Sequence, residues 1–227
     1  LKEHVGGVEG VPIIIRSDSV EYEPMSPGYF FRSMKEMPLL EREALQMCRG
    51  KVLDVGFAAG AHALELLGRG LDVYGVDVSP GAVSVAIARG FTQVRQIDFN
   101  RLEGEHFDTI LLMMNGVGMC GTLKKLPGFL RRCQSLLTSD GQILLDSADL
   151  QHLFMEEDGS LMVNLGVRYY GEVRYQMQYR NIVGRPFEWL YVDFYSLSRI
   201  AAKVGLRAEL IASQEDHSYL ARLTKLQ

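Results

Sequence analysis

The feature that most constrains the fold is a short apolar strand that leads directly into a glycine-bearing turn and then into a helix. The predicted strand is residues 52–55, the turn is residues 56–60 and the helix is residues 61–67. Small residues in such a turn let the backbone approach a ligand closely, and the first N–H groups of the following helix are free to bind it. The segment therefore predicts a ligand-binding crevice at the carboxyl end of a parallel strand.

Strands and helices alternate along most of the chain that follows this turn. Ser79 and Pro80 open the next helix as its N-cap and first residue, and Gly90 ends it. Further strands are expected at residues 71–76, 94–97, 107–113, 141–145, 206–212 and 219–223, and further helices at residues 123–137 and 196–204. Apolar strands separated by helices indicate a mostly parallel, doubly wound sheet with helices on both faces, which is an α/β fold.

The first 50 residues do not follow this alternation. Residues 1–32 are rich in glycine and proline, with one short strand expected at residues 11–15, and residues 38–49 have the apolar spacing of a helix. We interpret residues 1–50 as an N-terminal arm and helix that pack on a single domain spanning residues 1–227.

A second departure from the alternation is an insertion at residues 151–191. Apolar and polar residues alternate with a period of two over residues 163–170 and again over residues 173–180, which is typical of strands with one solvated face. A turn at Gly171 and Glu172 would join the two strands as a hairpin, and residues 187–192 would add a third strand. We therefore expect an antiparallel β insertion before the last helix.

Charge and cysteine content argue against several classes of protein. The chain has 227 residues and a net charge of −4, and it shows no basic stripe for phosphate contacts, so no nucleic-acid partner is expected. Its three cysteines are odd in number and lack the spacing of a zinc site, which favours a reducing, cytoplasmic setting without a metal. No apolar run reaches the ~20 residues of a membrane helix. The chain begins at Leu1 rather than Met, so a longer natural N-terminus is expected.

An acidic residue at the end of the second strand narrows the choice of ligand. Asp77 follows Gly56 by 21 residues, and a carboxylate there can accept hydrogen bonds from both hydroxyls of a ribose. A dinucleotide site uses the same arrangement, but its fingerprint has glycine where this chain has Ala58 and Ala61. Asp54 also suits a positively charged amino-acid group better than a diphosphate. A nicotinamide-dependent oxidoreductase remains the alternative on the residues alone.

Residues 54–60 resemble motif I of the class I S-adenosylmethionine-dependent methyltransferases, in which an acidic residue precedes three glycines in alternate positions. The match departs from the motif at Ala58, where the middle glycine is common. Asp77 matches the family's ribose-binding acid, residues 107–115 resemble its motif IV, and residues 141–145 match its glycine-led fifth strand. The resemblance covers residues 51–149 and resumes from residue 196. It implies a Rossmann-like fold of seven strands with the last strand antiparallel.

The resemblance also implies S-adenosyl-L-methionine as the cofactor and a set of contacts to it. Asp98 would contact the adenine amino group, Phe99 would pack on the adenine ring, and Asn115 would lie at the edge of the methyl-transfer site. The full set of cofactor contacts expected from the resemblance is Asp54, Gly56, Ala58, Gly60, Asp77, Val78, Asp98, Phe99 and Asn115.

The catalytic residues and the acceptor are less constrained by the sequence. Asn115, Asp146 and His152 are candidates for positioning the acceptor or acting as a base, although each also has an ordinary structural role as a turn, capping or surface residue. Aromatic residues that suit a small-molecule acceptor are Tyr22, Tyr29, Phe30, Tyr170 and Trp189. We expect a methyltransferase acting on a small molecule, with an inactive cofactor-binding module as a further alternative. An exposed hairpin edge also offers a surface for a homodimer.

Overall fold

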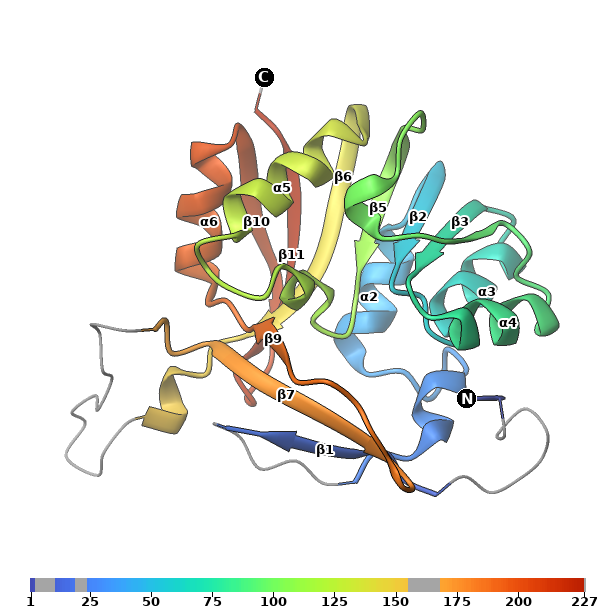
Figure 1. Ribbon diagram of the computed structural model, residues 1–227. Coiled ribbons are helices and arrows are strands. Elements are labelled where there is room, and N and C mark those ends of the chain that lie inside the picture. The colour runs from blue at the N-terminus through green and yellow to red at the C-terminus, as the bar shows by residue number, and fades with distance from the viewer. Residues whose placement is uncertain (3–10, 19–23, 155–167, 227) are drawn as a thin grey trace.

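The computed structural model describes residues 1–2, 11–18, 24–154 and 168–226, which contain two β-sheets (Figure 1). The larger sheet has the strand order β10-β11-β6-β5-β2-β3-β4. Its strands are β2 (Lys51–Val55), β3 (Asp72–Asp77), β4 (Val94–Gln96), β5 (Phe107–Leu112), β6 (Leu137–Ala148), β10 (Leu206–Ser213) and β11 (Ser218–Lys225). Strands β2 to β6 are parallel, whereas β11 is antiparallel to both β6 and β10. The predicted doubly wound, seven-stranded sheet is confirmed.

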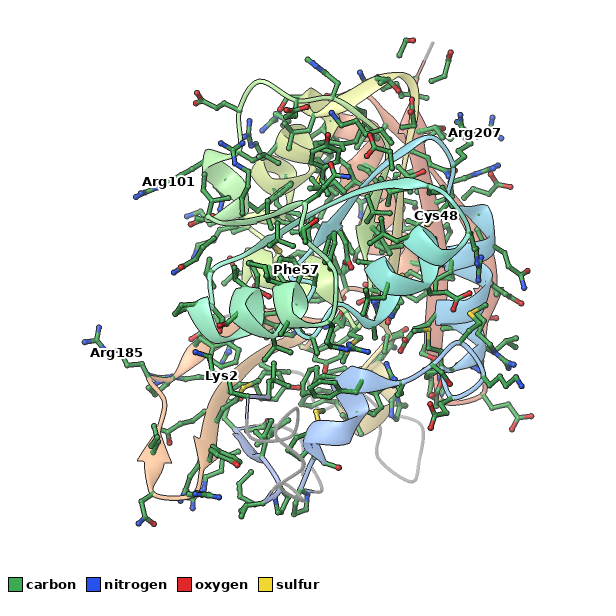
Figure 2. The ribbon with its side chains drawn as sticks, turned by 90° about the vertical axis from the view of Figure 1, so that its right-hand side faces the viewer. Lys2, Cys48, Phe57, Arg101, Arg185 and Arg207 are labelled. Carbon is green, nitrogen blue, oxygen red and sulfur yellow. The ribbon has the colours of Figure 1, made fainter. Side chains whose placement is uncertain are left out.

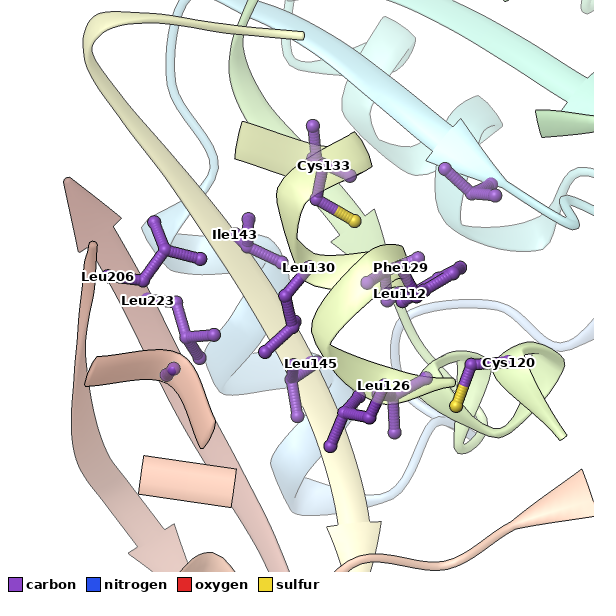
Figure 3. Packing of buried hydrophobic residues seen from close by; sticks show 14 of the residues in the cluster. Leu112, Cys120, Leu126, Phe129, Leu130, Cys133, Ile143, Leu145, Leu206 and Leu223 are labelled. Carbon is purple, nitrogen blue, oxygen red and sulfur yellow. The ribbon is translucent and has the colours of Figure 1, made fainter. Parts of the chain in front are cut away.

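Helices cover both faces of this sheet. They are α2 (Leu39–Met47), α3 (Ala61–Gly68) and α4 (Pro80–Ala88) on one face, and α5 (Leu126–Ser135) and α6 (Phe194–Lys203) on the other. Neighbouring residues of one strand belong to opposite faces: Leu111 packs toward α2 to α4, whereas Ile110 and Leu112 pack toward α5 and α6. Figure 3 shows the second of these layers, with Leu130 of α5 beside Ile143. Both faces are buried, which explains why the strand sequences are almost continuously apolar.

The smaller sheet is antiparallel, and we call it the cap sheet. It consists of β1 (Ile14–Ser17), β7 (Glu172–Tyr179), β8 (Ile182–Val183) and β9 (Phe187–Leu190). Strand β7 pairs with all three of the others. Figure 1 shows β1, β7 and β9 crossing beneath the end of the large sheet to which the arrow of β6 points. The cap sheet therefore lies at the carboxyl edge, where parallel sheets bind ligands.

Four 3-10 helices complete the described elements. They are η1 (Pro27–Phe31), η2 (Phe99–Arg101), η3 (Gly116–Cys120) and η4 (Gln151–Phe154). Three of them, η2, η3 and η4, follow the carboxyl ends of the parallel strands β4, β5 and β6, and η1 lies in the N-terminal arm. None of the helices in the described ranges is long and apolar enough to cross a membrane.

The structure differs from the sequence expectations in the pairing of the cap strands. The strand expected at residues 11–15 is found as β1, three residues later, and it joins the cap sheet by pairing Ile14 with Gln178. The predicted turn is present, since the Glu172 N–H donates to the Tyr169 carbonyl at 3.0 Å, but most of the strand expected before it lies outside the described residues. Period-two alternation identifies a strand but does not say which segment pairs with it.

Candidate active site

The crevice of the large sheet lies between β2 and β5, where the direction of winding reverses. From β2 the chain adds β3 and β4 on one side, and it then returns to add β5 and β6 on the other. Loops that leave the carboxyl ends of two such strands run in opposite directions and open a binding site. In this chain the two loops are residues 56–60 after β2 and residues 113–115 after β5.

The turn after β2 has a left-handed backbone at three alternate positions. The φ angles are +74° at Gly56, +51° at Ala58 and +78° at Gly60. Glycine adopts such angles at little cost, whereas alanine is strained there. The backbone at position 58 therefore explains why glycine is common at this place in motif I. Gly60 is also the N-cap residue of α3.

Two side chains from neighbouring elements hold this turn in place. The Asp77 carboxylate, at the end of β3, accepts hydrogen bonds from the N–H groups of Ala58 at 3.1 Å and Ser79 at 2.8 Å. Arg89, at the end of α4, donates to the Ala59 carbonyl at 2.5 Å. Burial raises the pKa of Asp77, although the N–H groups that it accepts oppose this effect. Val78, the next residue, is 66% exposed and leaves the edge of the site open to solvent.

Asp54 lies in β2 immediately before the turn and is almost completely buried. Its Oδ2 atom has no hydrogen-bond partner in the protein. Burial raises the pKa of this carboxyl to about 6, against the lowering effect of the nearby His62 and with a further increase from Asp77. A buried carboxylate with an unused oxygen is costly unless a donor or a cation reaches it.

Three charged side chains form a buried network beside Asp54. Arg32, which follows η1, donates from Nη2 to both carboxylate oxygens of Glu41 at 2.8 Å. Glu41 Oε2 lies 2.7 Å from Nε2 of His62, in the first turn of α3. Burial lowers the pKa of His62, but the hydrogen bond to Glu41 and the charges of Asp54 and Glu41 outweigh it, so the pKa is raised. Nε and Nη1 of Arg32 are buried without a hydrogen-bond partner, while its guanidinium carbon lies 3.4 Å from the centre of the Tyr29 ring.

A cavity of about 270 Å³ connects this charged region to the cap sheet. The N-terminal arm contributes Ile13, Ile15, Met25, Tyr29, Phe30 and Arg32, and the cap strands and the adjoining segment contribute Tyr175, Met177, Phe187, Trp189 and Tyr191. The large sheet and its loops contribute Asp54, Val55, Gly56, Phe57, Ala58, Ala61, His62, Met113, Met114, Gly116 and Met119. Phe57, labelled near the centre of Figure 2, also packs edge-on against Phe91 at 5.4 Å. The cavity thus joins the turn after β2 to the inner face of the cap sheet.

Two of the candidate catalytic residues lie off the cavity wall, and of these Asn115 is buried and Asp146 is half-buried. The Asn115 side chain donates to the Leu190 carbonyl at 3.0 Å and accepts from the Ser147 hydroxyl at 2.9 Å, so it joins β9 to β6. The Asn115 N–H donates to Asp146 at 2.9 Å. Burial raises the pKa of Asp146 to about 7. These contacts give Asn115 the geometry of a structural link.

Three further residues predicted from the sequence, His152, Asp98 and Phe99, do not line the cavity. His152 is exposed in η4, where its ring stacks on His217 at 4.2 Å. Asp98 caps η2 by accepting from the Asn100 N–H, and the ring of Phe99 is buried against Phe129 at 5.5 Å. The contacts of Asp98 and Phe99 with an adenine stay predictions.

The aromatic residues expected at the acceptor site divide into two groups. Tyr29, Phe30 and Trp189 lie on the cavity wall. Tyr170 instead donates to Asp149 and Asp193 outside the wall, and Tyr22 lies outside the described residues.

Sequence reasoning missed Arg32, Glu41 and His62 as members of the site. No local pattern distinguishes Arg32 or Glu41, because they reach Asp54 only through the packing of η1 and α2 on the sheet. His62 follows motif I by two residues, and that position in the first turn of α3 was the available signal. No group of three or more side chains able to hold a metal ion occurs in the described part of the chain.

The comparisons with known proteins agree with this geometry. A sequence profile described as a methyltransferase domain matches residues 52–141. No curated protein sequence matches at a significant level. A solved structure of an S-adenosylmethionine-dependent methyltransferase from Bacteroides fragilis, in complex with S-adenosyl-L-homocysteine, is 43% identical in sequence, with a TM-score of 0.89. The match covers 96% of this chain and 89% of that chain.

More distant structures share the fold. The CcbJ methyltransferase from Streptomyces caelestis is 15% identical, with a TM-score of 0.63 over 86% of this chain and 93% of that one. An S-adenosylmethionine-dependent methyltransferase from Clostridium acetobutylicum is 11% identical, with a TM-score of 0.58 over 81% of this chain and 87% of that one. The much higher identity to the Bacteroides protein, over almost the whole length, shows the family. Together with the glycine turn and the sheet order, it places the chain in the class I S-adenosylmethionine-dependent methyltransferases.

Proposed function

We propose that the crevice binds S-adenosylmethionine with its amino-acid end at Asp54 and Arg32 and its ribose at Asp77, for methyl transfer to a small molecule in the cavity beneath the cap sheet. The observation that carries the proposal is the unpartnered Oδ2 of Asp54, buried at the base of the cavity. A protonated amine would donate to this oxygen and remove the cost of leaving it unpaired. A diphosphate would place negative charge beside it, which argues against the dinucleotide alternative.

Arg32 supports the placement of the amino-acid end, because it offers a positive charge to the carboxylate of that group. Its Nε and Nη1 groups are buried donors on the cavity wall, and its remaining nitrogen already holds Glu41. Each of these two N–H groups can donate a charge-assisted hydrogen bond to a carboxylate. The wall therefore offers an anion and a cation to a zwitterionic amino acid. The Bacteroides protein was crystallised with a ligand that carries such a group, S-adenosylhomocysteine.

The ribose assignment rests on the position of Asp77. Its carboxylate accepts two backbone N–H groups, and a carboxylate has further lone pairs for hydroxyl donors. Asp77 also fixes the turn at Ala58, so the same side chain shapes the crevice and contacts the ligand. Gly56, Gly60, Val78 and Asp98 remain proposed contacts on the same edge.

The residues of the chain act by holding the reactants together. When bound, S-adenosylmethionine supplies a methyl group on a positively charged sulfur, which needs no further activation before transfer. The cavity holds the acceptor against the crevice, and such positioning accounts for a large part of the rate in reactions of this kind. Asp146 and His152 lie off the cavity wall, so we propose that the acceptor loses its proton without a dedicated base from these residues.

The setting and assembly of the protein follow from its surface and its cysteines. The three cysteines are unpaired, and burial raises the pKa of both Cys48 and Cys120 to about 12, which suits a reducing, cytoplasmic compartment. The net charge of −4 favours a small-molecule partner over nucleic acid. Ile182 is 73% exposed and Val183 is 55% exposed on the short strand β8, and this is the surface that we propose for a homodimer.

Calorimetric titration with S-adenosylmethionine, S-adenosylhomocysteine and NAD tests the proposal. We expect micromolar affinity for both adenosyl compounds and no heat from NAD. Binding of NAD in place of the adenosyl compounds would contradict it, and so would an absence of binding by all three.

A further inference from the structure

We propose that the acceptor is a small, uncharged aromatic compound of one or two rings that carries the hydroxyl or amino group to be methylated. The inference deepens the proposed function and rests on it, because it assigns the part of the cavity that the amino-acid end of the cofactor does not use. The side chains that the cap sheet places on the cavity wall are mainly apolar and aromatic.

The inner face of the cap sheet is apolar because of the two-residue period of its strands. In β7, Tyr175 and Met177 line the cavity, and in β9 Phe187 and Trp189 do so. The arm adds Ile15 from β1 at the same face. Alternate residues of a strand point to opposite faces, so the polar residues between these positions belong to the outer face.

Charged side chains in and beside the cap sheet make polar contacts away from the cavity wall. Arg168 forms ion pairs with Asp18 at 2.9 Å and with Glu188 at 2.6 Å. Arg16 of β1 donates to Gln178 of β7 at 3.2 Å. The cap sheet therefore places its charges away from the cavity.

The ionisable side chains on the described part of the wall, apart from tyrosines, are Arg32, Asp54 and His62, all at the end that we assign to the cofactor. A charged acceptor would therefore meet no opposite charge beneath the cap sheet, and burying an unpaired charge is expensive. This excludes a protonated amine or a carboxylate as the bulk of the acceptor.

The wall favours a flat aromatic ring over other apolar shapes. Five of the eight methionines among the described residues line the cavity, and they are Met25, Met113, Met114, Met119 and Met177. Methionine sulfur makes favourable contacts with ring edges, and aromatic rings pack edge-on or offset against others. Phe187 and Trp189 already meet edge to face at 5.8 Å. A cavity of about 270 Å³ is too small for a long lipid chain in addition to the cofactor's end.

A polar pair gives the acceptor's functional group a hydrogen-bonding partner. The hydroxyls of Tyr175 and Tyr191 lie 3.0 Å apart, and both residues are on the wall. A tyrosine hydroxyl both donates and accepts hydrogen bonds, which is the chemistry that an acceptor hydroxyl or amino group would meet on this wall. In the transfer, a bond forms between the acceptor oxygen or nitrogen and the methyl carbon. The methyl–sulfur bond breaks with its electron pair going to sulfur, and the acceptor proton passes to water.

One wall position is fixed by close packing. A Cβ added at Gly118 in η3 would lie 2.3 Å from Nε1 of Trp189, so only glycine leaves room for the indole ring. Trp189 is thus a rigid part of the wall. A rigid aromatic surface discriminates by shape better than a deformable one.

The test is a calorimetric titration of the protein loaded with S-adenosylhomocysteine. The probes are 2-naphthol, its saturated analogue decahydro-2-naphthol, and glucosamine as a cationic polar compound. We expect 2-naphthol to bind at least tenfold more tightly than the saturated analogue, and glucosamine to give no heat. Equal affinity for 2-naphthol and its analogue, or tighter binding of glucosamine, would overturn the aromatic assignment.

Two variants place the same charge on opposite faces of β7. Met177→Glu puts a carboxylate on the cavity wall, and Gln176→Glu puts one on the outer face at the neighbouring position. We expect Met177→Glu to weaken 2-naphthol binding at least tenfold and Gln176→Glu to leave it within twofold. Equal effects of the two variants would place the probe elsewhere and overturn the proposal.

The affinity for S-adenosylhomocysteine, measured for each protein, distinguishes a failure of the proposed function from a failure of the acceptor assignment. Unchanged affinity in both variants shows that they are folded with an intact cofactor site. A wild-type protein that does not bind S-adenosylhomocysteine would overturn the proposed function, and the acceptor assignment with it. Cofactor binding without the aromatic preference would overturn the acceptor assignment alone.

Discussion

The carboxyl edge of the large sheet and the inner face of the cap sheet line one cavity with opposite chemistry. The edge contributes Asp54, His62 and a turn with three left-handed residues, whereas the cap sheet contributes methionine and aromatic side chains. Asp54 at the edge has a buried carboxylate oxygen without a hydrogen-bond partner, whereas Glu188 of the cap sheet pairs with Arg168. In the proposed function, the edge and Arg32 of the N-terminal arm bind the charged cofactor, and the cap sheet selects the acceptor.

The largest loss of cofactor affinity is expected from a substitution at the end of β3. Asp77→Ala removes the proposed ribose acceptor and the clamp on the Ala58 N–H. Hydrogen bonds to charged groups are worth about 1.5–3 kcal/mol each, so we expect affinity for S-adenosylhomocysteine to fall at least ~100-fold. Asp72→Ala, at the opposite end of the same strand, is the control and should change affinity less than about twofold. Similar losses in both variants would contradict the ribose assignment.

Asn115 is the point at which the edge and the cap sheet are joined. Asn115→Ala removes the side-chain donor to the Leu190 carbonyl and the acceptor of the Ser147 hydroxyl in a buried site, so we expect urea unfolding to show a loss of about 2–4 kcal/mol. Affinity for S-adenosylhomocysteine should stay within about threefold. Unchanged stability with a large loss of affinity would instead restore Asn115 as a cofactor contact.

The ionisation of Asp54 makes the affinity for the cofactor depend on pH, whereas the apolar face of the cap sheet adds no such dependence to acceptor binding. Its pKa of about 6 in the free protein means that the carboxyl is anionic above that pH and neutral below it. Because a cationic amine binds the anionic form, affinity should be constant above pH 7 and fall by up to about tenfold per pH unit below pH 6. Arg32 and His62 are the other ionisable side chains at this end of the wall, apart from tyrosines, and the raised pKa of His62 favours its cationic form. Calorimetry at pH 5, 6 and 7.5 measures this, and affinity that rises toward acid would be the contradictory result.

The smallest effect is expected from backbone strain in the turn. Ala58 has a φ of +51°, which costs alanine about 1 kcal/mol relative to glycine, partly offset by the greater freedom of glycine in the unfolded chain. We therefore expect Ala58→Gly to stabilise the protein by about 0.5 kcal/mol in urea unfolding. Ala59→Gly, in the same turn but without a positive φ, should destabilise it by about the same amount or more. If both variants lost the same free energy of unfolding, backbone strain at Ala58 would be contradicted.

Local sequence signals predicted the large sheet better than the network around Asp54. Buried strands, caps such as Ser79 and the glycine turn are each encoded within a few residues, so they can be read directly. Arg32 and Glu41 come to the site only through tertiary packing, and Phe99 is turned into the core by its contact with Phe129. The cap sheet lies between these cases. Alternation predicted that β7 is a strand, but its pairing with β1 joins residues 158 or more positions apart.

The most direct test of the account compares S-adenosylhomocysteine with 5′-methylthioadenosine, which lacks the amino-acid end, in calorimetric titrations of the wild-type protein and Asp54→Asn. The assignment of Asp54 to the amine predicts that the variant loses at least ~30-fold in affinity for S-adenosylhomocysteine, the order of one hydrogen bond to a charged group. Its affinity for 5′-methylthioadenosine should stay within twofold of wild type. Equal losses for the two ligands, or no loss for either, would show that Asp54 does not bind the amino-acid end and would contradict the central claim.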